Sequence, residues 1–199
     1  MNVETLLDFW IGQAASDPAA AKAKSKLWYL SSAARDEDLR RRFGTTLTQA
    51  EHNKLPEWQA TERGQLALVV LLDQMSRNLY RGTAQAFAND QLALTSARAL
   101  IASGAHKQFS PIEQVFLYHP FEHAEELAAQ QQSITLFSEL LATADVAWHA
   151  QLADFLHHAQ EHHDIVARYG RFPHRNTILG RSSSAEEKAF LVGARRFGQ

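Results

Sequence analysis

A chain of 199 residues is long enough to bury a substantial core, and 45% of its residues are hydrophobic, which excludes an intrinsically disordered protein. The net charge of -2 argues against nucleic-acid binding through overall charge, and the absence of cysteine excludes disulfides, thiol nucleophiles and thiolate metal sites. The amino terminus lacks the basic start and cleavage site of a signal peptide, and the longest apolar run, residues 66–72, is too short to span a bilayer. We therefore expect a cytoplasmic protein with neither a membrane nor a nucleic-acid partner.

The amino-terminal half of the chain has helical periodicity. Apolar residues recur at i, i+3, i+4 and i+7 over residues 3–11, which predicts a first helix, followed by a connector at residues 16–24. Two weaker helices are expected at residues 36–43 and 46–53. Residues 61–79 are apolar on almost every side, so we predict a central helix that is buried around most of its circumference.

The second half begins with a helical region that extends to Ala102. The motif 110-SPIE-113 then gives a strong start signal, because Ser110 can cap the helix and Glu113 can complete a capping box. Pro120 should kink or end that helix, since proline lacks the backbone N–H of a helix interior. A further helix is expected from His123 to about residue 143.

The most regular pattern of the chain covers residues 148–169, where inward-facing positions recur at alternating spacings of four and three. Gly170 is expected to close this helix, and a last short helix starts near residues 183–187. No stretch alternates with the period of a β-strand for long enough to predict one. We therefore predict an all-α fold of antiparallel helix hairpins, with residues 1–199 in a single compact domain.

A charged residue interrupts the buried segment 69-VVLLDQM-75. Asp73 requires a partner there, and Arg77 stands four residues later, with Asn78 and Arg81 at the helix end. One interpretation is a buried ion pair that fixes helix packing. The other is that Asp73 orients Arg77 toward a ligand.

Two histidines share faces with apolar residues and should point inward. His162 occupies a position of the regular pattern, and His123 aligns with the apolar face of its own helix. A hydrogen-bonded core histidine is the commoner explanation for either residue alone. Glu122 and Glu125 stand beside His123 and are suited to set its tautomer or to transfer a proton.

The run 157-HHAQEHH-163 has the composition of a metal site, since His158 and His162 stand at i and i+4. The sequence contains neither H-E-x-x-H nor an E-x-x-H pair of the di-iron type. The motifs that bind nucleotide phosphates and the elbow of serine hydrolases are also missing from the sequence. We therefore expect no metal and no cofactor.

The segment 168-RYGRFPHRNTILGR-181 contains four arginines within fourteen residues, just after the most regular helix. Planar guanidinium groups can bind a carboxylate or phosphate ligand. They are equally suited to donate hydrogen bonds to the exposed carbonyls of a helix end. Both uses stay open for the polar residues of this loop, which are Arg171, His174, Arg175 and Asn176.

Four segments together resemble a known bacterial family: 7-LDFWIG-12, 71-LLDQMSRNLYRGTAQAF-87, 121-FEHAEELAAQQQSI-134 and 168-RYGRFPHRNTILGR-181. They look like the family catalogued as domain of unknown function 924, in the same order and over nearly the whole chain. The resemblance implies an all-helical fold similar to right-handed tetratricopeptide superhelices, and it implies no established activity. The family's polar positions correspond to Asp73, Gln74, Arg77, Asn78, Tyr80, Arg81, Glu122, His123, Glu125, His162, Arg171, Pro173, His174, Arg175 and Asn176.

Our preferred hypothesis is a helical protein whose polar cluster binds a small anionic molecule. The predicted ligand-binding residues are Asp73, Arg77, Asn78, Arg81, Arg171, His174, Arg175 and Asn176, and the candidates for proton transfer are Glu122, His123 and His162. One alternative is an adaptor for proteins or peptides, in which the polar cluster only stabilises the fold. Another is an enzyme of unknown reaction that uses the same histidine and glutamate residues.

Overall fold

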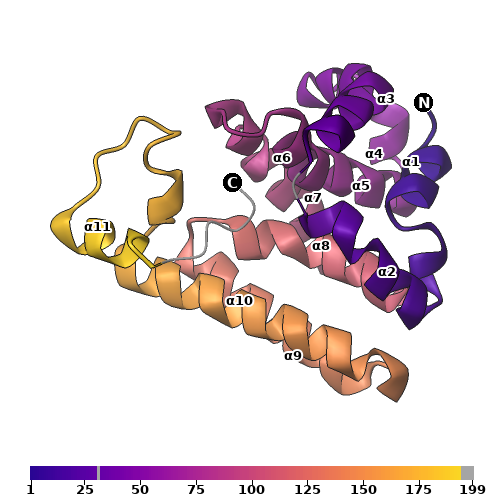
Figure 1. Ribbon diagram of the computed structural model, residues 1–199. Coiled ribbons are helices and arrows are strands. Elements are labelled where there is room, and N and C mark those ends of the chain that lie inside the picture. The colour runs from indigo at the N-terminus through magenta and orange to yellow at the C-terminus, as the bar shows by residue number, and fades with distance from the viewer. Residues whose placement is uncertain (31, 194–199) are drawn as a thin grey trace.

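The computed structural model describes residues 1–30 and 32–193, and every regular element within these ranges is a helix (Figure 1). The α-helices are α1 (Val3–Trp10), α2 (Pro18–Tyr29), α3 (Ala33–Glu51), α4 (Pro56–Gln59), α5 (Glu62–Val69), α6 (Ser76–Leu79), α7 (Asp90–Ala102), α8 (Pro111–His123), α9 (Leu127–Thr143), α10 (His149–Tyr169) and α11 (Ala185–Leu191). Short 3-10 helices are η1 (Gly12–Ala15), η3 (Ala84–Phe87), η4 (Ala105–Gln108), η5 (Val146–Trp148) and η6 (Pro173–Arg175), and η2 (Val70–Met75) is π-helical. No helix among the described residues is long and apolar enough to cross a membrane.

The helices from α7 to α10 pack side by side in chain order. Figure 1 shows α9 and α10 as a long antiparallel pair, with α8 next to them and the amino-terminal helices beyond α8. Helix α8 is the centre of the fold because α5 and α7 pack on one side of it and α9 on the other. Its Phe116 and Phe121 are fully buried, as is Phe137 of α9. The prediction of an all-helical, compact domain is therefore confirmed.

The predicted connector at residues 16–24 is wrong, because most of it belongs to α2. Asp17 caps this helix through Oδ1, which accepts a hydrogen bond of 2.8 Å from the backbone N–H of Ala19. Trp28 then fixes the helix in place, since its Nε1 donates to the Trp10 carbonyl at 2.9 Å and its ring packs against Phe116. Alanine-rich segments after such a cap favour a helix. This helix propensity explains why the segment is not a connector.

Two further boundaries differ from the prediction. The helices expected at residues 36–43 and 46–53 form the single helix α3, because Leu39, Phe43 and Leu47 form one buried stripe that continues past Gly44. The predicted central helix is continuous from α5 to α6, but its middle third is the π-helical segment η2. That widened turn includes Asp73, and π-helical turns frequently occur at functional sites.

Pro120 does not end α8, which continues to His123. The break falls instead at residues 124–126, so the helix expected to resume at His123 begins at Leu127. Gln130 stabilises this break, because its Nε2 donates to the carbonyls of Glu122 and Ala124 at 2.6 and 2.7 Å. The side chain of a following helix thus satisfies the last carbonyls of α8, which sequence spacing does not reveal.

The other end signals are confirmed. Gly170 adopts a left-handed conformation with φ of 69° at the end of α10, and its N–H donates to the Val166 carbonyl. Ser110 and Glu113 form the predicted capping box of α8. Helix α11 starts with a second capping box, two residues after the start of the predicted segment 183–187.

Candidate functional site

A cavity of about 790 Å³ lies between α2, the end of the central helix, α8 and α10. Trp28, Tyr29 and Phe155 give it an aromatic wall. Polar side chains from the central helix, α8 and α10 also line the cavity, among them Arg77, Asn78, Arg81, Glu122, His123 and His162. Gln151 of α10 links the two sides of the rim, because its Nε2 donates to the Pro18 carbonyl of α2 at 2.6 Å.

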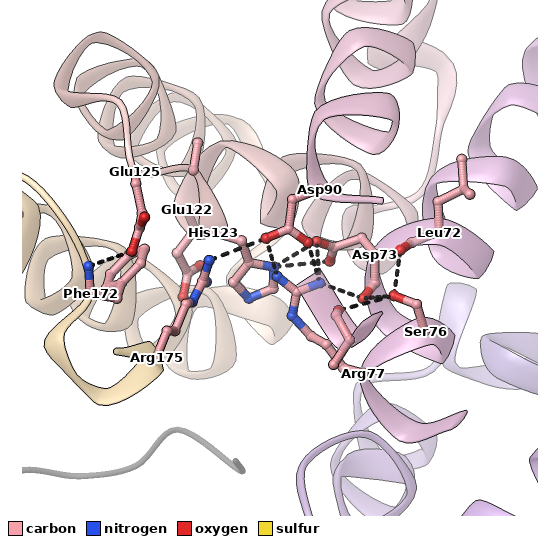
Figure 2. Close-up of polar contacts among 12 residues, drawn as sticks. Leu72, Asp73, Ser76, Arg77, Asp90, Glu122, His123, Glu125, Phe172 and Arg175 are labelled. Atoms are coloured by element: carbon pink, nitrogen blue, oxygen red, sulfur yellow. Dashed lines mark hydrogen bonds and ion pairs between the residues drawn. The ribbon is translucent and has the colours of Figure 1, made fainter. Parts of the chain in front are cut away.

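Asp73 organises the polar side of the site from a fully buried position (Figure 2). Nδ1 of His123 lies 2.8 and 3.0 Å from its two carboxylate oxygens. Gln74 donates to Oδ2 at 2.6 Å, and Nη1 of Arg77 lies 3.1 Å from Oδ1. One carboxylate therefore holds both a histidine and an arginine that line the cavity.

Arg77 is anchored by two carboxylates on one side of its guanidinium group. Nη1 donates to the Asp73 carbonyl at 2.7 Å and lies 2.9 Å from Oδ1 of Asp90, while Nη2 donates to Oδ2 of Asp90 at 3.0 Å. Burial lowers the pKa of Arg77, but Asp73 and Asp90 outweigh burial and raise it above its ordinary value. Nε makes no hydrogen bond to any residue that the structure describes, and Nη2 uses one of its two N–H groups.

Arg175 extends this network away from the cavity. Its Nη1 donates to Oδ2 of Asp90 at 3.2 Å, and its guanidinium group lies over the rings of Phe87 and Phe172, 4.6 and 4.5 Å from their centroids. Burial lowers the pKa of Arg175 to about 10, so the group stays charged at neutral pH. The two arginines and two aspartates balance one another in charge.

His123 is held in one tautomer. Burial and the nearby charge of Arg77 lower its pKa well below the ordinary value, so the imidazole is neutral at pH 7. Asp73 accepts the proton on Nδ1, which leaves Nε2 as a hydrogen-bond acceptor and a base.

A second histidine and carboxylate stand next to this pair. Nδ1 of His162 lies 2.8 Å from the His158 carbonyl, which can only accept, and 3.1 Å from Oε1 of Glu122. Burial raises the pKa of Glu122 to about 8, and burial lowers that of His162 to about 4. At neutral pH, Glu122 is therefore a protonated acid beside a neutral imidazole. The rings of His123 and His162 are 6.2 Å apart between centroids.

Arg81 and Asn78 line the cavity but are tied to α3. Nε and Nη2 of Arg81 donate to the two oxygens of Asp36 at 2.7 and 3.3 Å, and Nδ2 of Asn78 donates to Oδ1 at 3.1 Å. Asp36 therefore occupies the side of the Arg81 guanidinium group that would otherwise bind a ligand carboxylate.

The loop at residues 168–181, which we call the arginine loop, binds carboxylates of the protein itself. Arg171 donates from Nε and Nη2 to the two oxygens of Glu187 at 2.7 and 2.9 Å. Arg181 donates from Nη1 and Nη2 to the two oxygens of Glu125 at 2.5 and 2.8 Å. The first pair joins the loop to α11 and the second joins it to the α8–α9 junction.

The predicted site residues therefore divide into two groups. Those that line the cavity are Arg77, Asn78, Arg81, Glu122, His123 and His162, while Asp73 lies behind them in contact with Arg77 and His123. Those that do not line it are Arg171, His174, Arg175 and Asn176. His174 packs against the ring of Phe172, and Asn176 bonds with Arg181 and Ser183 inside the arginine loop. Among the described residues, no group of three or more His, Asp or Glu side chains is arranged to hold a metal ion.

Several residues of the site escaped the sequence interpretation. They are Trp28, Tyr29, Asp36, Asp90 and His119. His119 had a usable signal, because it stands four residues before His123 on the same face of α8, and their rings stack at 5.6 Å. The two aspartates lie 13 residues or more from the arginines that they bind, and no local pattern links them.

Comparisons with known proteins agree with the family resemblance. The family model described as bacterial protein of unknown function (DUF924) matches residues 6–194. A solved structure of a protein of unknown function from Agrobacterium tumefaciens is similar to this chain, with a TM-score of 0.80 and 38% sequence identity over 96% of this chain and 97% of that one. No curated protein matches the chain. The chain belongs to the DUF924 family of bacterial proteins of unknown function.

Proposed function

We propose that the protein binds a small organic anion in the cavity, through a carboxylate or phosphate group of that molecule. Arg77 carries this proposal. Its Nη1 side is fixed by Asp73 and Asp90, and the opposite edge, formed by Nε–H and the second N–H of Nη2, makes no bond within the described residues. We call this pair of donors the Nε edge. Two parallel donors of a guanidinium group match the two oxygens of a carboxylate or phosphate.

Arg77 is held in position before any ligand binds, which favours anion binding at its Nε edge. A surface arginine loses side-chain freedom when it binds a ligand, but Asp73 and Asp90 already restrict Arg77. The side chain is largely buried, with 11% of its surface exposed, so water screens its charge less than on the open surface. An anion at the Nε edge would therefore meet a fixed and partly desolvated cation.

The test is thermal unfolding of the wild type and Arg77→Lys with a panel of carboxylate and phosphorylated metabolites. A ligand at 100 times its dissociation constant should stabilise the wild type by about 2.7 kcal/mol, or roughly 5 to 10 °C. Lysine keeps the charge near Asp73 and Asp90 but has no planar edge, so the shift should disappear in this variant.

Arg171→Lys is the matched control, because it makes the same change in the arginine loop, where Glu187 already occupies the Nε edge of Arg171. It should respond to ligand as the wild type does. An equal shift in Arg77→Lys, or the lack of any shift across the panel, would contradict the proposal.

The histidine and carboxylate pairs favour a second candidate function, acid–base catalysis on the bound molecule. Asp73 fixes Nδ1–H of His123, so Nε2 can accept a proton, and protonated Glu122 can supply one. Conversion of any ligand found by binding can be followed by NMR. His123→Gln should abolish conversion while ligand still binds, and unchanged conversion would rule out His123 as the base.

The adaptor alternative rests on the tetratricopeptide-like superhelix, which only the family resemblance implies. It requires a continuous groove of exposed apolar side chains. The large exposed apolar residues of the described chain are instead distributed over several elements, and among them only Tyr29 and Leu30 are consecutive: Met1, Tyr29, Leu30, Leu92, Leu127, Val146 and Val192. This distribution favours a small molecule in the cavity over a peptide on the surface.

A further inference from the structure

We infer that the ligand is a monocarboxylic acid with an aromatic or aliphatic body, rather than a phosphorylated or dicarboxylic metabolite. This inference rests on the proposed function, since it takes Arg77 as the anion-binding group. Three properties of the cavity carry it: the number of available cationic edges, the position of negative charge, and the aromatic wall.

The cavity offers one buried guanidinium edge. The corresponding edge of Arg81 is occupied by the two oxygens of Asp36, and Arg175 does not line the cavity. Lys22 is the other cation of the lining, and it is exposed on α2. The two N–H donors and single positive charge of this edge match one carboxylate group. A phosphate monoester has a charge near -2 and three acceptor oxygens, which one such edge does not satisfy.

Negative charge disfavours a second anionic group on the ligand. Asp154 lies on the same cavity lining, on α10, one residue before the aromatic Phe155. The other arginines near Arg77 already pair with carboxylates of the protein, Arg81 with Asp36 and Arg175 with Asp90. A second carboxylate would therefore enter without a buried cation to pair with, and buried unpaired charges are strongly unfavourable.

The opposite wall suits an apolar body. The ring of Tyr29 lies 6.2 Å from that of Phe155 and 6.4 Å from that of His119, and His119 lies 6.0 Å from Phe155, all measured between centroids. Tyr29 retains 44% of its surface exposed. A ring or hydrocarbon chain over Tyr29 would remove this apolar surface from water.

Calorimetric titration of the wild type with five compounds tests the inference: 3-phenylpropionate, its primary amide, acetate, succinate and inorganic phosphate. We expect 3-phenylpropionate to bind at least tenfold more tightly than each of the other four. The amide lacks the negative charge of the carboxylate, and acetate lacks the aromatic group. Succinate and phosphate carry more negative charge than one guanidinium edge can pair with.

Each titration result that differs from this expectation contradicts a different part of the inference. Tighter binding of phosphate or succinate overturns the monocarboxylate class but leaves an anion site at Arg77. Equal binding of the amide overturns the anion site itself. If none of the five binds at millimolar concentration, the inferred class is wrong, and the metabolite panel with Arg77→Lys still decides the proposed function.

Two variants isolate the aromatic wall. Tyr29→Ala removes the ring and should weaken 3-phenylpropionate at least tenfold, and a cooperative thermal transition of the free variant verifies that it is folded. Leu30→Ala, at the neighbouring exposed position, should bind the compound as the wild type does. Equal affinities of Tyr29→Ala and Leu30→Ala would show that the ligand body does not contact this wall.

Discussion

Arg77 and Arg171 occupy similar settings in the sequence but different ones in the fold. Both lie near a helix end, both precede a polar cluster, and both were predicted to bind a ligand. In Arg171, Nε and Nη2 donate to the two oxygens of Glu187, so its Nε edge is already occupied. In Arg77 the same edge makes no bond within the described residues, while Asp73 and Asp90 hold the other side.

The difference lies in where the carboxylates stand. The arginine loop meets Glu125 and Glu187 on neighbouring elements, and these residues complete the pairing of Arg181 and Arg171. The partners of Arg77 approach from its own helix and from the start of α7, so they cover only one side of its guanidinium group. A cluster of arginines therefore indicates a ligand site only where an arginine lines a cavity and has N–H groups that are not bonded to carboxylates of the protein.

Among the variants that test this comparison, Asp73→Asn should lose the most stability. The change is almost isosteric, but it removes the buried charge that Arg77 and His123 both contact. We expect the free energy of unfolding to fall by about 3 kcal/mol, or roughly 6 to 12 °C in melting temperature. Urea denaturation measures this loss, and stability equal to that of the wild type would show that the pairing has little energetic value.

Glu122→Gln should change how stability depends on pH. The folded pKa of about 8 lies above the ordinary value of 4.5, so between these values the folded protein retains a proton that the unfolded chain releases. Wild-type stability therefore contains a contribution that is complete below pH 4.5 and is lost as pH rises to 8. Glutamine mimics the protonated acid, so its stability relative to the wild type should rise as the pH increases from 5 to 9.

Urea unfolding of both proteins at pH 5, 7 and 9 measures this difference. Glu62→Gln, at an exposed position in the first turn of α5, serves as a control for the loss of one carboxylate. A difference between Glu122→Gln and the wild type that does not vary with pH would mean that Glu122 is ionised in the folded protein.

Glu125→Gln should affect stability but not ligand binding. It removes the charge that Arg181 contacts with two nitrogens and that accepts from the Phe172 N–H at 2.7 Å. Because both side chains of the ion pair are about three-quarters buried, we expect a loss of about 1 to 2 kcal/mol. Thermal unfolding with and without ligand separates the two effects. Loss of the ligand response in a folded Glu125→Gln protein would place the arginine loop in the site.

Arg171→Ala should have the smallest effect. Its partner Glu187 also caps α11 through the backbone N–H of Ser184, so the helix start is retained without the arginine. We expect a small decrease in melting temperature and unchanged affinity for every ligand of the cavity. Calorimetry on this variant checks the expectation, and a tenfold loss of affinity would contradict the distinction between Arg171 and Arg77.

Two helix ends were predictable from the sequence because their signals are local. The Ser110 capping box and the Gly170 end depend on residues within one or two turns, and both are present. Pro120 does not end α8, and the carbonyls at the actual end accept hydrogen bonds from Gln130, a residue of the next helix. Helix boundaries stabilised by tertiary hydrogen bonds leave no mark in local spacing.

The candidate site was predictable to a similar degree. Asp73, Arg77 and His123 were identified because a charge or an imidazole on an apolar face demands a partner. Which arginines keep open donors depends on Asp36 and Asp90, whose contacts span 45 and 13 residues of sequence. The aromatic wall was missed because α2 was interpreted as a connector, so Tyr29 had no predicted place in the fold.

The most direct test of the central claim is an NMR titration that observes the Nε–H group of each arginine. Arg77→Lys and Arg171→Lys identify two of these signals by their disappearance. On addition of 3-phenylpropionate, the Arg77 signal should shift with saturation, while the Arg171 signal, already bonded to Glu187, stays in place. A shift of Arg171 with no change at Arg77 would show that the anion binds to the arginine loop and would contradict the account.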